Sequence, residues 1–165
     1  MPEWRLVGSE IPATVVPNRT NQCPVGRRGE KVEHFRNGDR PTKLGPAEYF
    51  TGTVLQDPIV EAPDPARIRA VRVTFMPGGR TNWHTHPLGQ TLYVVSGEGR
   101  YQAEGEKIVA IRAGDTIWIP PGERHWHGAA PNLMMCHIAF QEALDGSHIS
   151  WQEPVSEEDY TANPE

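Results

Sequence analysis

The sequence predicts an all-β domain, and two observations carry that prediction. Short stretches rich in β-branched, aromatic and alternating residues recur from about residue 48 onward, separated by turn residues. Gly and Pro are abundant, with 16 of each among 165 residues. No convincing amphipathic helix separates the stretches, which argues against a parallel βαβ arrangement. A sandwich, a jelly roll or a small barrel remains.

The chain divides by composition into an arm, a domain and a short tail. Residues 1–44 contain five prolines and four glycines and show no sustained period of 3.6 or 2.0. We expect an irregular arm there, and two interpretations stay open: a disordered tail, or an extension that caps a sheet edge of a neighbouring subunit. Residues 45–160 form the predicted domain, and 161–165 a C-terminal tail.

About eight short strands are expected within this domain. Residues 70–75 alternate most clearly, with Val71, Val73 and Phe75 on one face. Residues 156–160 predict one helical turn that Ser156 caps. The other segments are, in order, a strand at 49–55, a turn leading into a strand at 63–70, a strand at 91–97, a hairpin at 97–111, a short strand between turns at 113–122, and a strand at 133–142.

Charge and composition exclude several classes of protein. The net charge is −5, so the chain lacks the basic surface that nucleic-acid binding needs. No apolar run approaches the roughly 20 residues of a membrane helix, and the N-terminus lacks the apolar core of a signal peptide. Cys23 and Cys136 form no disulfide framework. We therefore expect a cytoplasmic protein that binds neither nucleic acid nor membrane.

Histidines supply the strongest functional signal. Five of the seven lie between His84 and His137. His84 and His86 are two residues apart, so on a strand both imidazoles point to one face. His125 follows a Pro-Pro-Gly turn, and His127 faces the same way if the strand is regular. The pattern favours a metal site, and a hydrogen-bonded histidine cluster without metal is the alternative.

The spacing of these residues resembles the cupin superfamily, whose two motifs are G(x)5HxH(x)3–4E(x)6G and G(x)5PxG(x)2H(x)3N. Here Gly78 and Gly97 bracket His84, His86 and Gln90 at the intervals of the first motif. The second motif runs from Gly114 through Pro120 and Gly122 to His125. This resemblance implies a conical jelly-roll barrel, also called a double-stranded β-helix, with metal ligands His84, His86, Gln90 and His125. Two positions depart from the motifs, since Gln90 replaces a glutamate and Ala129 an asparagine.

Residues 45–160 resemble one branch more closely, the metal-dependent hydroxynitrile lyases of small bacterial cupins. The matching stretches are GPAEYFTGTV, EAPDPAR, HTHPLGQTL, PPGERHWHGAAP and QEALDG. In that branch the fourth ligand is also Gln, and manganese is the metal. The resemblance implies Mn at the site, although imidazole and carbonyl donors also suit Fe, Ni, Co or Zn. A neutral glutamine leaves the metal its full +2 charge, which strengthens a Lewis acid.

Residues 133–142 alternate and predict a strand on which His137 and Gln141 share one face. Two polar residues on an otherwise apolar face suggest the wall of a cavity. The alternative is that His137 is a hydrogen-bonded histidine of the core. By resemblance, His137 matches the acid/base of the lyases, and Gln141, Val71 and Val73 match their substrate pocket. Neutral imidazole accepts a proton near neutral pH. His127 either relays that proton or orients a ligand.

Three functions are compatible with this sequence. The first is a metal-dependent lyase on small hydroxylated substrates, tested most directly by cyanohydrin cleavage. The second is another metal enzyme of this fold, an Fe(II) dioxygenase or a sugar-acid isomerase. The third is a non-catalytic module that binds a small molecule, because one fold hosts many functions. The resemblance also implies a homo-oligomer, a dimer or a tetramer.

Overall fold

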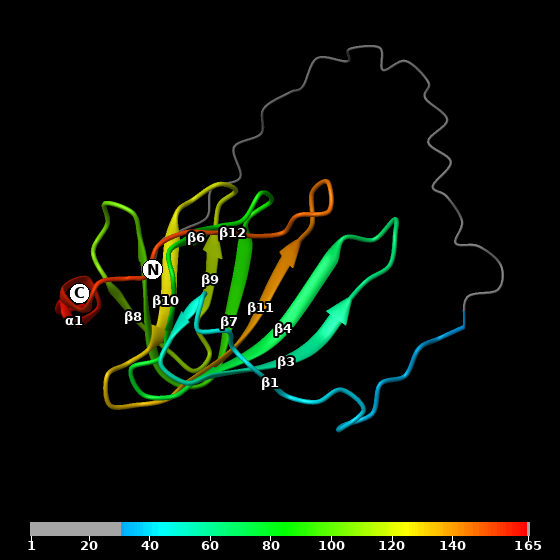
Figure 1. The fold of residues 1–165 in the computed structure, drawn as a ribbon, viewed down its shortest axis with the longest axis horizontal. Helices are drawn as coiled ribbons and strands as arrows, with labels where there is room; N and C mark the ends of the chain where they lie inside the picture. The colour runs from blue at the N-terminus through cyan, green and yellow to red at the C-terminus, as the bar shows by residue number, and fades with distance from the viewer. Residues whose placement is uncertain (1–30, 165) are drawn as a thin grey trace, which may run out of the picture. The chain divides into compact units, whose positions relative to one another are not determined.

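The computed structural model describes residues 31–164. The chain divides into two units, residues 1–34 and 35–165. In its described part the second unit consists of antiparallel strands and one short helix, which confirms the predicted all-β class (Figure 1). Among the described residues, no helix combines the length and the apolar character that crossing a membrane requires.

A single curled sheet forms the framework (Figure 1). Along its main path the strands lie in the order β1-β3-β4-β11-β7-β10-β5-β2. Strands β8 and β9 pair with β7, β6 pairs with β10, and β12 pairs with β6. The bounds are β1 Lys43–Leu44, β2 Phe50–Thr51, β3 Val54–Glu61, β4 Ile68–Phe75, β5 Arg80–Thr81, β6 His84–Thr85, β7 Gln90–Ala103, β8 Val109–Arg112, β9 Thr116–Ile119, β10 His125–Ala129, β11 Met135–Glu142 and β12 Ser150–Trp151.

Strand β7 connects the two halves of the curled sheet. Its first part pairs with β9 and β11, and its last part pairs with β8 and β10. The strand bends at Gly97, whose φ is 79°. A Cβ at this position would lie 1.9 Å from the carbonyl oxygen of Met134. Only glycine combines this backbone conformation with so close an approach, so Gly97 fixes the corner that encloses the interior.

The interior is apolar at its base. Val54, Phe75, Leu92 and Met135 are buried on four neighbouring strands. They point inward because side chains alternate along each strand, and the register aligns Phe75 with both Val54 and Met135. Each such side chain contributes about 1.5–3 kcal/mol through burial. Phe75 connects this cluster to two buried imidazoles, since its ring centroid lies 5.7 Å from that of His127 and 5.5 Å from that of His137.

A second apolar cluster lies under the C-terminal segment and contains Trp83, Ile108, Trp126, Val155 and Tyr160. The helix α1 (Glu157–Thr161) carries Tyr160 into this cluster. Its N-cap hydroxyl accepts a hydrogen bond from the backbone N–H of Asp159, which confirms the helical turn predicted from the sequence.

The predicted arm, residues 1–44, falls largely outside the described residues. Its final two residues, Lys43 and Leu44, form β1 and pair with Gln56 and Leu55 of β3. Paired sheet structure therefore begins two residues before the domain boundary expected at residue 45. The sequence pattern missed β1 because a two-residue strand carries no measurable alternation.

Candidate metal centre and cavity

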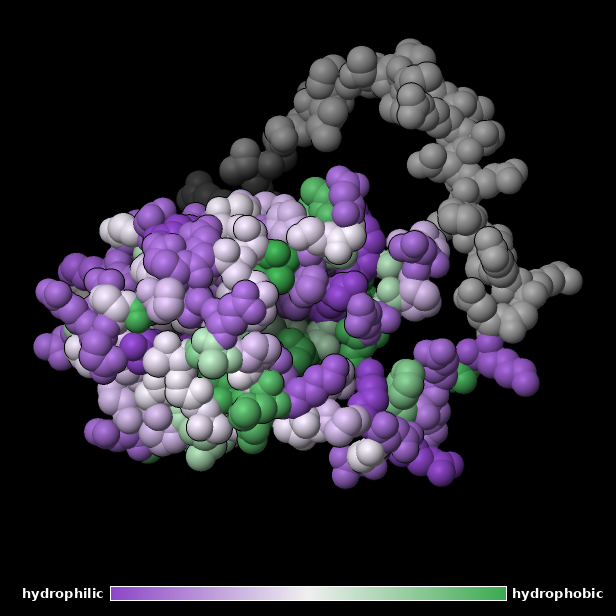
Figure 2. Space-filling view, viewed as in Figure 1, coloured by the Kyte–Doolittle hydropathy of each residue, from purple (hydrophilic) through white to green (hydrophobic). Residues whose placement is uncertain are grey.

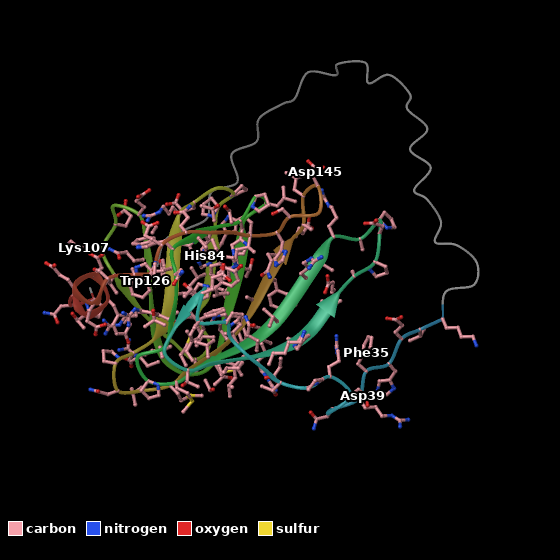
Figure 3. All side chains as sticks on the ribbon, in the orientation of Figure 1. Phe35, Asp39, His84, Lys107, Trp126 and Asp145 are labelled. Carbon is pink, nitrogen blue, oxygen red and sulfur yellow. The ribbon has the colours of Figure 1, made fainter. Side chains whose placement is uncertain are left out.

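Strands from distant parts of the sequence bring the predicted ligands together. His84 in β6 lies directly opposite His125 in β10, and their ring centroids are 4.2 Å apart. His86 follows β6, with its ring centroid 5.2 Å from that of His84. Gln90 opens β7, and its Oε1 lies 3.1 Å from Nε2 of His125. The structure thus gathers all four residues that the cupin motifs mark; Figure 3 shows His84 within the curled sheet.

Backbone carbonyls fix the orientation of the three imidazoles. A carbonyl oxygen only accepts hydrogen bonds, so each Nδ1 that contacts one is protonated and donates. Each Nε2 then carries the lone pair that a metal ion requires. The Nδ1 contacts are His84 to Asn82 (2.9 Å), His86 to His148 (2.5 Å) and His125 to Glu123 (2.9 Å).

The donor atoms fit a metal ion. One ring nitrogen each from His84, His125 and His127 lies within 4.8 Å of the others, so three buried histidines are positioned to bind a metal. Nε2 of His86 is buried and has no hydrogen-bond partner, which is the expected state of a ligand atom. The sequence motif includes His86 in the ligand set, whereas the tightest histidine group in the structure includes His127. Both imidazoles border the same cavity.

Burial keeps these imidazoles neutral. Desolvation lowers the pKa of His86 to about 4 and that of His125 to about 4, and it lowers the pKa of His84 well below its usual value. Neighbouring imidazoles disfavour protonation of His84 further. Neutral imidazole is the form that binds metal, so the site needs no proton release at neutral pH.

His127 and His137 form a pair beside this cluster. Nε2 of His137 lies 3.3 Å from Nδ1 of His127, and both side chains are buried. The two outer ring atoms, His127 Nε2 and His137 Nδ1, have no hydrogen-bond partner. Desolvation lowers the pKa of His137 to about 3, and burial together with the His137 ring lowers that of His127. The pair is therefore neutral and able to share a proton.

A cavity of about 310 Å³ opens beside the histidines. The predicted pocket residues Val71, Val73 and Gln141 all line it, and so does His127. His137 is not among its lining residues and contacts it through the neighbouring His127 ring. No Asp, Glu, Lys or Arg belongs to the lining that the structure describes.

Aromatic side chains form a wall of the cavity that sequence reasoning missed. Tyr49 and Trp151 stack with ring centroids 4.8 Å apart, and Phe50 meets Trp151 edge-on at 5.5 Å. Trp151 also lies 4.9 Å from the His84 ring, by centroids. No sequence pattern marks this wall, because about 100 residues separate Phe50 from Trp151. Phe50 is placed by the pairing of β2 with β5, and Trp151 by the pairing of β12 with β6.

Comparison with known proteins agrees with this architecture. The Cupin domain family matches residues 71–137. The chain is 54% identical over 129 residues to an (R)-mandelonitrile lyase of Granulicella tundricola, covering 78% of this chain and 98% of that protein. A cupin-like protein of Thermotoga maritima has a similar structure, with a TM-score of 0.69 and 35% identity over 78% of this chain and 95% of the other.

A more distant relative matches only in part. The chain is 29% identical over 93 residues to an acireductone dioxygenase of Parasynechococcus marenigrum, covering 54% of this chain and 47% of that protein.

An antiparallel sheet curled around buried histidines defines a cupin-type barrel. The chain belongs to the cupin family, and its identity with a lyase over most of both sequences makes it a lyase-like enzyme.

Proposed function

We propose that this protein is a metal-dependent hydroxynitrile lyase, which cleaves a cyanohydrin into a carbonyl compound and hydrogen cyanide and also runs the reverse reaction. The observation that carries the proposal is the buried His127–His137 pair at an uncharged, aromatic cavity beside the histidine cluster. The relative named (R)-mandelonitrile lyase supports the same reaction and suggests R preference.

His84, His86, Gln90 and His125 would hold the metal, and we propose manganese. The donor set is neutral, since three imidazoles and one amide oxygen carry no charge. When bound, a divalent metal supplies undiminished positive charge that stabilises anions in the cavity. Iron, nickel, cobalt and zinc accept the same donor types, so metal analysis decides among them.

The histidine pair moves the proton. His127 lines the cavity, and its Nε2, which has no partner within the described protein, accepts the proton of the substrate hydroxyl. Its Nδ1–H then passes a proton to Nε2 of His137. As the C–O bond becomes a carbonyl, the bond to the nitrile carbon breaks and its electron pair leaves with cyanide. The proton then returns along the pair to cyanide and gives HCN. The depressed pKa of His137 favours this return, because burial destabilises its protonated form.

The cavity wall favours a small neutral substrate. Tyr49, Phe50 and Trp151 suit an aromatic ring, whereas a sugar acid would need a cationic partner that the described lining lacks. The partial match to acireductone dioxygenase keeps an Fe(II) oxygenase as a second candidate. That candidate predicts substrate-dependent oxygen uptake, whereas the lyase consumes none.

Cleavage of racemic mandelonitrile, followed by benzaldehyde release, tests the proposal. Protein loaded with manganese is expected to cleave it far above background, and chelated protein is expected to lose that activity. Oxygen consumption is recorded in the same samples. Background cleavage alone in the metal-loaded protein would refute the lyase, and binding without turnover would then identify a non-catalytic module.

A further inference from the structure

A second compartment of about 290 Å³ adjoins the histidine-lined cavity. Four residues line both spaces, namely Gln56, Val71, Gln141 and His148. The two spaces differ in character, because Lys43, Glu61 and Arg69 line the second and no charged residue belongs to the described lining of the first. A ligand seated at the histidines therefore meets polar groups where one space passes into the other. In Figure 2, polar residues cover most of the face in view, and apolar residues gather near its centre.

Strand register explains this polar boundary. Four polar residues lie side by side across adjacent strands: Glu61 of β3 opposite Arg69 of β4, Arg69 opposite Gln141 of β11, and Gln141 opposite Gln90 of β7. Because side chains alternate along a strand, Arg69 and Gln141 share the inward face with Val71 and Ala139, two residues further along. One end of this row is the predicted metal ligand, and the other end is the second compartment.

Two members of the row offer hydrogen bonds to a ligand. Oε1 of Gln141 is buried and has no partner, a state that costs about 1–3 kcal/mol unless a donor arrives. Nη1 of Arg69 lies 2.7 Å from Oε1 of Glu61. A guanidinium carries five N–H donors, so this ion pair leaves Arg69 with donors for a ligand in the compartment that it lines.

We propose that Gln141 and Arg69 form a second subsite, which binds a neutral hydroxyl on the aromatic ring of the substrate. A phenolic hydroxyl donates to the Gln141 oxygen and accepts from the Arg69 guanidinium, so it satisfies both groups. A carboxylate is disfavoured at this point, because Glu61 already pairs with Arg69 and the Gln141 oxygen would repel an anion. The remaining charged residue of the lining, Lys43, is exposed, so solvent screens its charge. The substrate class is thus a hydroxyaryl cyanohydrin, an inference that rests on the proposed lyase function.

Binding of alcohols that lack a nitrile tests the subsite separately from turnover. Calorimetric titration of the full-length protein compares benzyl alcohol with 3- and 4-hydroxybenzyl alcohol. We expect at least one hydroxylated alcohol to bind about tenfold tighter than benzyl alcohol, the effect of one or two added hydrogen bonds. In Gln141→Met this preference is expected to disappear, and in Arg69→Gln to fall severalfold.

Arg72 provides a matched control. It lies on the same strand as Arg69, pairs with an acid of β3 in the same way (Asp57, 3.1 Å), and faces away from the cavity. Arg72→Gln is therefore expected to keep the full preference. Equal binding of all alcohols to the natural protein, binding of none, or tighter binding of 4-(hydroxymethyl)benzoate would each overturn the subsite. Failure of mandelonitrile cleavage with the hydroxyl preference intact would refute the lyase alone.

Discussion

Two buried polar clusters lie on different sides of the curled sheet and differ in the partners of their polar atoms. The imidazole cluster occupies the interior beside the cavity and consists of the buried residues His84, His86, His125, His127 and His137. The arginine cluster, made of Arg80, Arg100 and Tyr160, lies under the C-terminal segment. Arg80 donates to the Glu157 carboxylate at 2.9 Å, and Arg100 donates to the Tyr160 carbonyl at 2.7 Å. Both guanidinium groups also stack on the Tyr160 ring.

The difference lies in what each cluster leaves unpaired. Arg80 and Arg100 have unpartnered Nε atoms, yet their terminal nitrogens bind chain segments that they hold in place. In the imidazole cluster, the unpartnered His86 Nε2 and His127 Nε2 belong to residues that border open space. Burying a polar group without a partner is costly, so such a state persists where a ligand completes it. The arginine cluster thus has the contacts of a structural element, and the imidazole cluster is the proposed reactive site.

Removal of a predicted metal ligand is expected to have the largest effect on activity. His84→Ala is expected to lose the metal and to slow cyanohydrin cleavage about a thousandfold or more, since the lost charge stabilisation amounts to several kcal/mol. Metal analysis and benzaldehyde release measure the two effects. Retention of metal and full activity would remove the histidine cluster from the reaction.

Substitution within the His127–His137 pair is expected to have the next largest effect on activity. His137→Ala is expected to retain the metal and to lose about 10²–10⁴-fold in turnover, the usual contribution of a general base. The parallel variant His127→Ala separates two roles. Loss of metal there would identify His127 as a ligand, and loss of turnover alone would identify it as the relay.

Acid is expected to lower the free energy of unfolding of the metal-free protein, because the buried imidazoles resist protonation. Burial lowers the folded-state pKa of His86, His125 and His137 below 6.5, so between about pH 4 and 6.5 the unfolded chain binds more protons. The contribution of these neutral histidines to the free energy of unfolding of metal-free protein is therefore fully present above pH 6.5. It falls as the pH drops, by about 1 kcal/mol per such histidine per pH unit. Urea unfolding of chelated protein at pH 7.5 and 5.5 measures this. Equal midpoints at the two pH values would contradict neutral burial.

Substitution in the arginine cluster is expected to have the smallest effect on turnover. Arg100→Met leaves the carbonyl of Tyr160 without its donor and is expected to lower the free energy of unfolding by about 2–4 kcal/mol. Turnover per folded molecule should stay at the natural level. Urea unfolding gives the first quantity, and the mandelonitrile assay at low temperature gives the second.

The sequence predicted the parts of this structure that depend on short spacing. His84 and His86, two residues apart, and the Pro-Gly turn before His125 marked the site. The alternation of residues 70–75 placed Val71 and Val73 on one face, and the resemblance to the lyases implied that this face lines the pocket, as it does. Contacts made by distant strands were not predictable. The His127–His137 contact depends on how β10 and β11 are folded together, and the aromatic wall depends on the pairing of β12 with β6.

Other expectations stay predictions. Manganese, the homo-oligomer and the cytoplasmic location concern ions, partners and compartments, and each needs a measurement in solution or in cells. The arm over residues 1–44 belongs with them, since residues 1–30 lie outside the described part of the chain.

The rate of mandelonitrile cleavage per folded, metal-loaded molecule, compared among the natural protein, His137→Ala and Arg100→Met, tests whether the imidazole cluster and not the arginine cluster performs the reaction. The two variants each remove one buried cationic or imidazole side chain, one from each cluster. We predict rapid cleavage by the natural protein, a loss of about 10²–10⁴-fold in His137→Ala, and an unchanged rate in Arg100→Met. Equal rates in the natural protein and His137→Ala, or an equal loss in both variants, would contradict the account.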